Sequence, residues 1–280
     1  MRPAAAPLAL PEVTLICVDN RTPELALQAL RHCMAQATFG EVVFFTDPAL
    51  LAQAPEGIRV EPVAIRSVPE YSDLVLRGLL PHVHTSHCLL VQWDGYVLDA
   101  RQWRPEWLDL DYIGALFRRR SGELCVGNGG FSLRSRRLLQ ALQDPALNLA
   151  HPEDVSLCCD NRVRLEQVHG IRFASAQQAQ RFSFERIGPT EGTFGFHGLF
   201  NMHRVMPEPA LAALITALPD ALTQGLDAHD LCRSLIREGR LALAGKLLAK
   251  RLRLGMRDRR TWRLRIQLMG AQILKKIRSS

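Results

Sequence analysis

The first ninety residues alternate short apolar runs with helix-forming stretches, and this alternation limits the fold more than any other feature. Runs with the length and composition of buried strands occupy residues 12–19, 41–46, 58–63 and 87–92. Between them, Thr22-Pro23-Glu24 opens a helix that continues to about Thr38, and a second helical pattern covers residues 72–83. Strands connected through helices form a parallel sheet covered on both faces. The sequence therefore predicts a doubly wound α/β fold.

The pattern changes in the second half of the chain. We expect a strand at residues 111–117, a charged turn at 118–122, and helices at 135–142 and 153–168, with Phe131–Arg134 leading into the first of these helices. Residues 192–203 mix strand and loop, and the pattern from Glu208 onward is wholly helical. These shifts predict three parts: a loose leader at residues 1–11, an α/β domain at 12–206, and a helical C-terminal extension at 207–280 that ends in a basic tail.

The charge of the chain is unevenly distributed. The net charge is +7, but residues 246–280 carry twelve Lys or Arg and a single acid, Asp258, which gives this tail +11 and the rest of the chain −4. The body therefore gives no reason to expect a nucleic-acid groove, and we expect no nucleic-acid partner.

Cysteine usage and hydropathy indicate the compartment. The seven cysteines are an odd number without a CxxC pair, and several lie in apolar runs, as in Leu15-Ile16-Cys17-Val18. This pattern is typical of buried thiols in a reducing compartment. No apolar stretch reaches the roughly 18 residues that a spanning helix needs. We expect a cytoplasmic protein.

Four short motifs carry the chemistry. Asp94 follows the buried run 87–92 and precedes Gly95, and a carboxylate at the end of a strand can hold a cation or merely form a turn. The glycine-rich segment 127–130 exposes backbone N–H groups to a phosphate or sugar, or is a plain turn. Glu153 and Asp154 follow Pro152 at the start of a helix, where acids are favoured whatever their function. His197 stands in Phe194-Gly-Phe-His-Gly198, with His203 as a competing histidine.

In their order and spacing these motifs resemble GT-A-fold glycosyltransferases. The phrases Gln-Trp-Asp-Gly, Asp-Tyr-Ile-Gly-Ala, Gly-Asn-Gly-Gly-Phe-Ser-Leu-Arg-Ser, Pro-Glu-Asp and Phe-Gly-Phe-His-Gly further resemble a bacterial glycosyltransferase-like domain family without assigned function. The resemblance covers about residues 12–205. It implies a GT-A-like (Rossmann-like) doubly wound mixed sheet, followed here by a helical C-terminal extension.

The resemblance also implies roles for single residues. Asp94 and His197 would hold a divalent metal, Mn or Mg, although Gln92 replaces the first acid of the family's DxD motif and puts metal dependence in question. Asp154 would be the catalytic general base and Glu153 an orienting partner. The expected donor-binding residues are Asp19, Asn20, Arg21, Tyr71, Trp93, Asp94, Asn128, Gly129 and Gly130.

The expected function follows from these roles. The chain would move a sugar from a nucleotide-diphosphate donor to a hydroxyl of a glycan or glycolipid acceptor, with inversion and Asp154 as base. One alternative is a non-catalytic protein that binds a nucleotide sugar or glycan with a decayed site. A nucleotidyltransferase is another.

The tail intersperses its basic residues with apolar ones, among them Trp262, Ile266, Ile273 and Ile277. A basic amphipathic helix with a tryptophan can bind an anionic membrane surface, which would place the protein at the inner face of the membrane. The alternative is a solvated basic helix packed on the catalytic domain. Gly255 and Gly270 are expected to break the helix into pieces.

Overall fold

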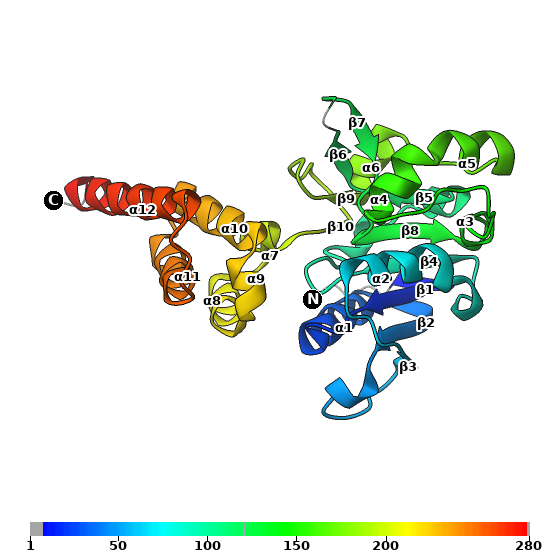
Figure 1. The fold of residues 1–280 in the computed structure, drawn as a ribbon, viewed down its shortest axis with the longest axis horizontal. Helices are drawn as coiled ribbons and strands as arrows, with labels where there is room; N and C mark the ends of the chain where they lie inside the picture. Colours follow the sequence, from blue (N-terminus) through cyan, green and yellow to red (C-terminus); the bar gives the residue numbers. More distant parts are fainter. Residues whose placement is uncertain (1–7, 120, 279–280) are drawn as a thin grey trace, which may run out of the picture. The chain divides into compact units, whose positions relative to one another are not determined.

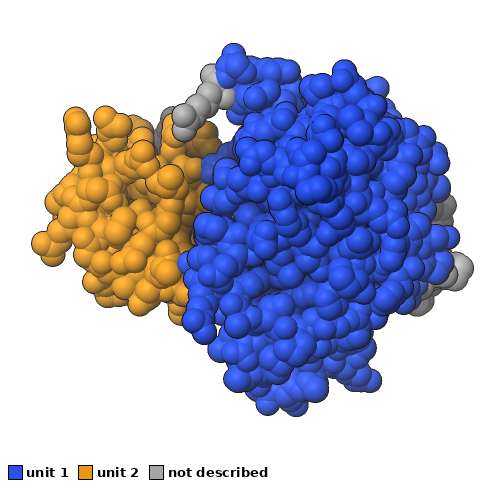
Figure 2. Space-filling model, turned by 45° about the vertical axis from the view of Figure 1, so that its right-hand side comes forward, with its two compact units in different colours: residues 1–197 blue, residues 198–280 orange. Residues whose placement is uncertain are grey.

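The computed structural model describes residues 8–119 and 121–278. The chain forms two compact units, residues 1–197 and 198–280 (Figure 2). The first holds the sheets and the helices up to α6, and the second holds α7 to α12 (Figure 1). The division falls between His197 and Gly198, earlier than the predicted one at residue 206.

The main sheet of the first unit has six strands in the order β3-β2-β1-β4-β8-β5. Its strands are β1 (Leu8–Val18), β2 (Ala37–Thr46), β3 (Arg59–Pro62), β4 (His87–Val91), β5 (Tyr112–Gly114) and β8 (Phe131–Ser135). β1 to β4 pair in parallel, and β8 runs antiparallel to both of its neighbours, β4 and β5. The sheet is therefore mixed, and the predicted α/β class with a helical C-terminal extension is confirmed.

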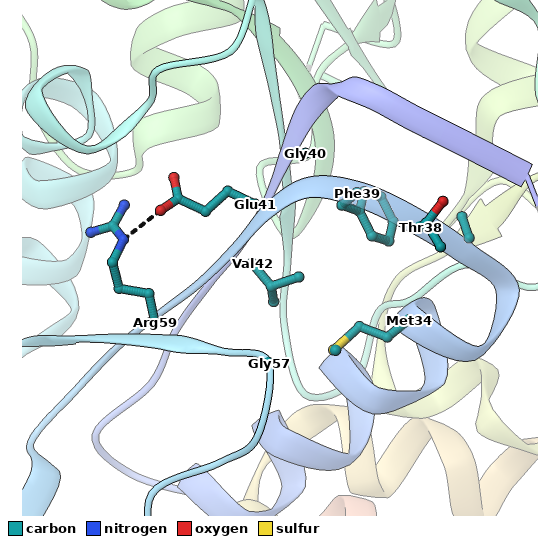
Figure 3. Close-up of a pocket in the computed structure, with 9 residues that line it drawn as sticks. Met34, Thr38, Phe39, Gly40, Glu41, Val42, Gly57 and Arg59 are labelled. Carbon is teal, nitrogen blue, oxygen red and sulfur yellow. Dashed lines mark hydrogen bonds and ion pairs between the residues drawn. The ribbon is translucent and has the colours of Figure 1, made fainter.

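Both faces of the central strands are buried, as a doubly wound sheet requires. One face presents Ile16 and Leu90 to a core that also contains Val75 and Leu139, which follow α2 (Val68–Asp73) and lie in α3 (Arg136–Ala141) respectively. The fully buried Leu15 alternates with Ile16 along β1, and α1 (Pro23–Gln36) contacts β1 and β2. These helices cover the central strands, and a surface pocket lies beside the start of β2, where Met34 of α1, residues 37–42, Gly57 and Arg59 line it (Figure 3).

Two expectations for the first unit need correction. Residues 8–10 do not form a loose leader, because they pair with residues 37–39 at the start of β1 and bury Leu10; residues 1–7 lie outside the described part. Residues 131–134 belong to a buried strand rather than to a lead into a helix. The first strand segment was missed because prolines flank it in the sequence. The second was missed because Phe131–Ser135 contains Ser and Arg, which are untypical of a buried strand.

Further differences concern local geometry. The predicted charged turn belongs to a hairpin of β6 (Leu116–Arg118) and β7 (Leu124–Val126). The helix expected at residues 72–83 begins earlier, at Val68, where the Ser67 hydroxyl caps the first turn, and it continues as a π-helical turn at 74–78. The helix expected at 153–168 is divided into α4 (Glu153–Val155), a π-helical turn at 156–160 and α5 (Arg162–His169).

The remaining elements of the first unit are short. Helix α6 (Ala176–Phe182), which the sequence did not reveal, leads into β9 (Ser183–Phe184), and β9 pairs in parallel with β10 (Gly195–Phe196). Short 3-10 helices lie at residues 48–50, 80–82, 100–102 and 105–109.

The second unit is helical. After a 3-10 turn at 199–201 it contains α7 (Met202–Val205), α8 (Glu208–Ala217), α9 (Asp220–Gln224), α10 (Leu226–Arg237), α11 (Leu241–Arg253) and α12 (Arg259–Arg278). Pro219 separates α8 from α9. Gly255, at φ +79°, separates α11 from α12, but Gly270 does not interrupt α12, contrary to expectation. Within the described ranges, no helix is long and apolar enough to cross a membrane.

Candidate functional site

The candidate site lies at the carboxyl edge of β1 and β4. These two strands pair with Cys17 opposite Val91, so that the segments that follow them, with Asp19 and Asp94, leave the sheet at the same edge. β8 runs in the opposite direction and pairs Phe131 with Val91. The glycine segment 127–130 therefore enters the sheet where the segment 92–95 leaves it. Ligands of open α/β sheets bind at this edge.

His197 is the centre of this site. Its Nε2 lies 3.0 Å from the amide oxygen Oε1 of Gln92 and 3.4 Å from a carboxylate oxygen of Asp94. On the other side of the ring, Nδ1 lies 3.2 Å from the amide of Asn128 and 3.8 Å from a carboxylate oxygen of Glu185. The imidazole therefore joins the segments that follow β4 and precede β8 to the end of β9.

The carboxylates control the charge of His197. Burial disfavours the imidazolium, but the negative charges and hydrogen bonds of Asp94 and Glu185 prevail and raise the pKa of His197 to about 10. His197 is therefore protonated at neutral pH and places a positive charge at the carboxyl edge of β4. The Asp94 and Glu185 carboxylates already pair with that charge, so that the three side chains together present no excess positive charge, and a diphosphate would need a further cation or hydrogen-bond donors to bind there.

Two glycines permit the close packing around this centre. A Cβ atom at Gly130 would overlap the His197 ring, and a Cβ atom at Gly129 would overlap the Glu153 carboxylate. Asn128, directly before them, has a left-handed backbone with φ +63°, which Asn tolerates better than most residues. The glycine segment thus lies between His197 on one side and Glu153 on the other, and brings the two into one site.

Glu153 and Asp154 occupy different environments at the start of α4. Glu153 is buried under Gly129, and burial together with the adjacent Asp154 raises its pKa, while Arg134 opposes that rise. Arg134 is itself fully buried in β8 and donates hydrogen bonds to the Ser132 hydroxyl and the Val75 carbonyl, both at 3.0 Å. Asp154 is half-buried and accepts a hydrogen bond from the backbone N–H of Val155. Asp154 is therefore the carboxylate of this pair that solvent and substrates can reach more easily.

Tyr71 fixes the orientation of Gln92. The Gln92 amide nitrogen donates a 2.7 Å hydrogen bond to the Tyr71 hydroxyl, so that the amide oxygen is directed at His197. Burial raises the pKa of Tyr71 and keeps its hydroxyl protonated. Tyr71, predicted to bind the donor, thus contacts the residue that replaces the first acid of the DxD motif.

The segment after β1 has its polar groups engaged locally. The Asp19 carboxylate accepts hydrogen bonds from the backbone N–H groups of Arg21 and Thr22, both at 2.6 Å. The Asn20 side chain bonds the Val63 carbonyl and the Asp47 N–H, which connects the ends of β1, β2 and β3. These hydrogen bonds show that Asp19 and Asn20 stabilise the loop that follows β1. Arg21 is exposed at the same edge, and a donor contact of these three residues stays a prediction.

Trp93 is half-buried beside Asp94. In the sequence it stands between Gln92 and Asp94, which both contact His197, so that its backbone lies at the same edge of the sheet. A donor contact by Trp93 likewise stays a prediction.

The donor atoms around His197 Nε2 fit part of the coordination shell of a hard cation. Asp94 and Gln92 offer oxygens, which suit Mg²⁺ or Mn²⁺, and the imidazole would have to lose its proton before it could bind. Across residues 8–119 and 121–278 there is no group of three or more His, Cys, Asp or Glu side chains arranged for a metal ion. The protein would thus supply only a few ligands, and the phosphates and water would supply the others.

Glu185 is a site residue that the sequence did not reveal. It directly follows β9, whose Phe184 pairs with Phe196 of β10, and this register places Glu185 beside His197. The preceding strand is only two residues long, Ser183–Phe184, so that the sequence lacks the buried apolar run that singled out Asp94. The competing histidine, His203, belongs to the second unit and pairs with Glu238 at 2.7 Å.

Comparison with known proteins gives three kinds of result. No curated protein matches the sequence. Among solved structures, the chain is similar to the galactosyltransferase LgtC in complex with donor and acceptor sugar analogs, with 13% identity and a TM-score of 0.40 over 66% of this chain and 86% of that one. An active-site mutant of LgtC gives 12% identity, a TM-score of 0.40 and the same coverage. HddC from Yersinia pseudotuberculosis gives 13% identity and a TM-score of 0.31 over 46% of this chain and 78% of that one.

A family model matches residues 57–197, half of the chain. The matched segment begins just before β3 and ends at His197, so that it contains Tyr71, Asp94, the glycine segment, Glu153 and Glu185. The chain therefore belongs to the family described as protein of unknown function (DUF5672).

Proposed function

We propose that this chain is a glycosyltransferase that moves a sugar from a nucleotide-diphosphate donor to a hydroxyl group of a glycan or glycolipid. The observation that carries the proposal is the position of His197 between Asp94 and Glu185, next to a glycine segment whose other side packs on Glu153. A centre that could hold the diphosphate, through hydrogen-bond donors or a divalent cation, and a carboxylate pair on the other side of the same backbone segment are what a transfer from a diphosphate to a hydroxyl needs.

The His197 side of the site would bind the leaving group. As the sugar leaves, negative charge accumulates on the diphosphate, and hydrogen-bond donors or a cation held in place lower the barrier. The imidazolium of His197 is paired with Asp94 and Glu185, so that it would act as a hydrogen-bond donor rather than as an unpaired charge, and the backbone N–H groups of the glycine segment are further candidate donors. If a divalent metal binds, Asp94, Gln92 and neutral His197 would hold it, and it would neutralise the charge on the phosphates.

The carboxylate side of the site would activate the acceptor. We assign the general base to Asp154, which is the more accessible of the pair and would take the proton of the acceptor hydroxyl. Inversion follows if that oxygen bonds to the anomeric carbon directly, while the bond to the diphosphate breaks on the opposite face. Glu153, enclosed by Gly129 and facing Arg134, would orient the loop and the substrate. Tyr71 and Asn128 would hold Gln92 and His197 in the binding arrangement.

The test measures binding first and turnover second. The protein is screened by thermal shift against a panel of nucleotide sugars and free nucleotides with Mg²⁺, Mn²⁺ or EDTA. A ligand at about 100 times its Kd stabilises a two-state unit by roughly 2.7 kcal/mol, which is a readily measured shift. Asp94→Asn should reduce the shift, whereas Asp109→Asn, a change of the same chemistry at an exposed position, should leave it intact.

Turnover separates the candidate activities. A glycosyltransferase releases a nucleoside diphosphate or monophosphate from the sugar donor, and a nucleotidyltransferase releases pyrophosphate from a nucleoside triphosphate. Donor binding with no turnover, either to water or to any glycan acceptor, would instead indicate a binding protein. If no nucleotide or nucleotide sugar raises the melting temperature under any of the metal conditions, the proposed function is wrong.

A further inference from the structure

Helix α12 of the second unit has two apolar stripes. One contains Thr261, Leu264 and Leu268, which are at most 7% exposed, and it packs within the unit, where α12 contacts α10 and α11. The other stripe faces solvent and contains Trp262, Ile266, Met269, Ile273 and Ile277, which are 45–68% exposed. Only the first of these stripes is needed to build the core of the unit.

The exposed stripe has helical geometry. Its members follow one another at intervals of three or four residues, so that they lie on one side of the helix. At about 1.5 Å per residue, the distance from Trp262 to Ile277 is roughly 22 Å. Single exposed apolar side chains are common on protein surfaces, but a continuous stripe of this length indicates a binding surface.

Positive charge surrounds the stripe. α12 contains seven Lys or Arg residues and no acid. At 100° per residue, Arg263 and Arg265 fall on opposite borders of the stripe, and the Arg265 guanidinium lies 4.9 Å from the centre of the Trp262 ring. Residues 198–280 carry sixteen basic and six acidic groups, a net +10, whereas residues 1–197 carry nineteen and twenty-two, a net −3. The charge is therefore concentrated in the unit that carries the stripe.

We propose that the exposed stripe of α12 binds in the plane of an anionic lipid membrane. Its apolar side chains would enter the boundary between headgroups and acyl chains, with Trp262 at the headgroup level and the bordering Arg and Lys residues at the lipid phosphates. A second copy of the chain is a poor occupant because two acid-free helices would repel each other. The proposal depends on residues 259–277 and does not rest on the proposed sugar transfer.

Sedimentation of the full-length chain with vesicles tests the proposal. We expect binding to vesicles of two parts phosphatidylcholine and one part phosphatidylglycerol, little binding to phosphatidylcholine alone, and weaker binding as salt increases. Ile266→Ser combined with Ile273→Ser should lower the partition coefficient by roughly tenfold or more, because two apolar side chains no longer leave water. The matched control is Val163→Ser combined with Val168→Ser, which changes two valines of the first unit that are 61% exposed and should leave binding unchanged.

The fluorescence of Trp262 reports the depth of the helix. Emission should shift to shorter wavelength when phosphatidylglycerol vesicles are added, and Trp262→Phe should abolish the shift, although three other tryptophans remain. Circular dichroism of each variant shows whether the second unit still folds.

Three outcomes would overturn the proposal. The first is a failure of the folded full-length chain to bind anionic vesicles at low salt. The second is undiminished binding of the Ile266→Ser, Ile273→Ser variant, which would mean that charge alone attracts the chain. The third is self-association in vesicle-free buffer that the same double substitution removes, because the stripe would then be an interface between copies. Loss of sugar transfer with intact vesicle binding would overturn only the proposed function.

Discussion

Replacement of Gly130 by alanine tests the packing on which the candidate site depends. The added Cβ would overlap the His197 ring and would lie 2.7 Å from its Cε1 atom. Gly130 does not have a positive φ, so that any effect comes from space rather than from backbone conformation. A shift of the ring would disturb its contacts with Gln92 and Asp94 at Nε2 and with Asn128 and Glu185 at Nδ1.

The expected cost can be estimated from these contacts. Overpacking of a tight site costs about 1–3 kcal/mol, and the loss of a charge-assisted hydrogen bond at His197 costs about 1.5–3 kcal/mol. Alanine has less conformational freedom than glycine in the unfolded chain, and this offsets about 0.4–1 kcal/mol of the loss in the free energy of unfolding. We therefore expect Gly130→Ala to lower the free energy of unfolding of the first unit by about 2–5 kcal/mol and to weaken nucleotide-sugar binding.

Urea unfolding followed by circular dichroism measures the loss, and the NMR pH titration of His197 shows whether the ring has moved away from its carboxylates. Gly188→Ala is the matched control, because a Cβ atom there meets nothing within 4 Å and the backbone has no positive φ. The reasoning is refuted if Gly130→Ala unfolds at the same urea concentration as the native chain and leaves the titration of His197 unchanged.

Three further predictions concern the same site. His197 has a pKa of about 10 in the folded chain against an ordinary 6.5. Its contribution to the free energy of unfolding is therefore fully present below pH 6.5 and is lost as the pH rises to about 10. Urea unfolding across this pH range should show that the free energy of unfolding of the native chain falls by roughly 3–5 kcal/mol, whereas that of the His197→Gln variant does not show this fall. The same pH dependence in both chains would contradict the raised pKa of His197. Asp154→Asn should preserve donor binding by thermal shift while initial rates fall by roughly 100-fold or more, and near-normal turnover would mean that the base is another residue. Tyr71→Phe leaves the Gln92 amide nitrogen without its partner, which should lower the free energy of unfolding by about 1–3 kcal/mol in urea; an unchanged unfolding midpoint would show that water replaces the hydroxyl.

The parallel half of the sheet was predictable because its strands are buried on both faces. Such strands are continuous apolar runs, as in Leu15-Ile16-Cys17-Val18, and their identity does not depend on distant partners. β8 was not predictable in the same way. Its Arg134 is fully buried only because the Ser132 hydroxyl and the Val75 carbonyl accept its hydrogen bonds, and Val75 is distant in the sequence. Local sequence does not contain that information.

Among the residues of the candidate site, too, those with a local sequence signal were predicted, and those placed by contacts distant in the sequence were not. Asp94 and the glycine segment were found because a carboxylate after a buried strand and a run of glycines are local signals. Glu185 was missed because its place beside His197 depends on the pairing of two two-residue strands, β9 and β10. The different environments of Glu153 and Asp154 also depend on tertiary packing, since Gly129 covers only Glu153 in this pair. Adjacent residues with the same charge cannot be distinguished from the sequence alone.

The reversed direction of β8 has a consequence for how such a site can diversify. In a wholly parallel sheet, every segment at the carboxyl edge is one that has just left a strand. Here residues 127–130 arrive at that edge on their way into β8, opposite the residues that leave β4. Insertions or substitutions in the arriving segment can reshape the candidate site while the register of Val91 with Phe131 stays fixed. Selection for a new ligand can therefore act on the two segments separately, while the strands stay unchanged.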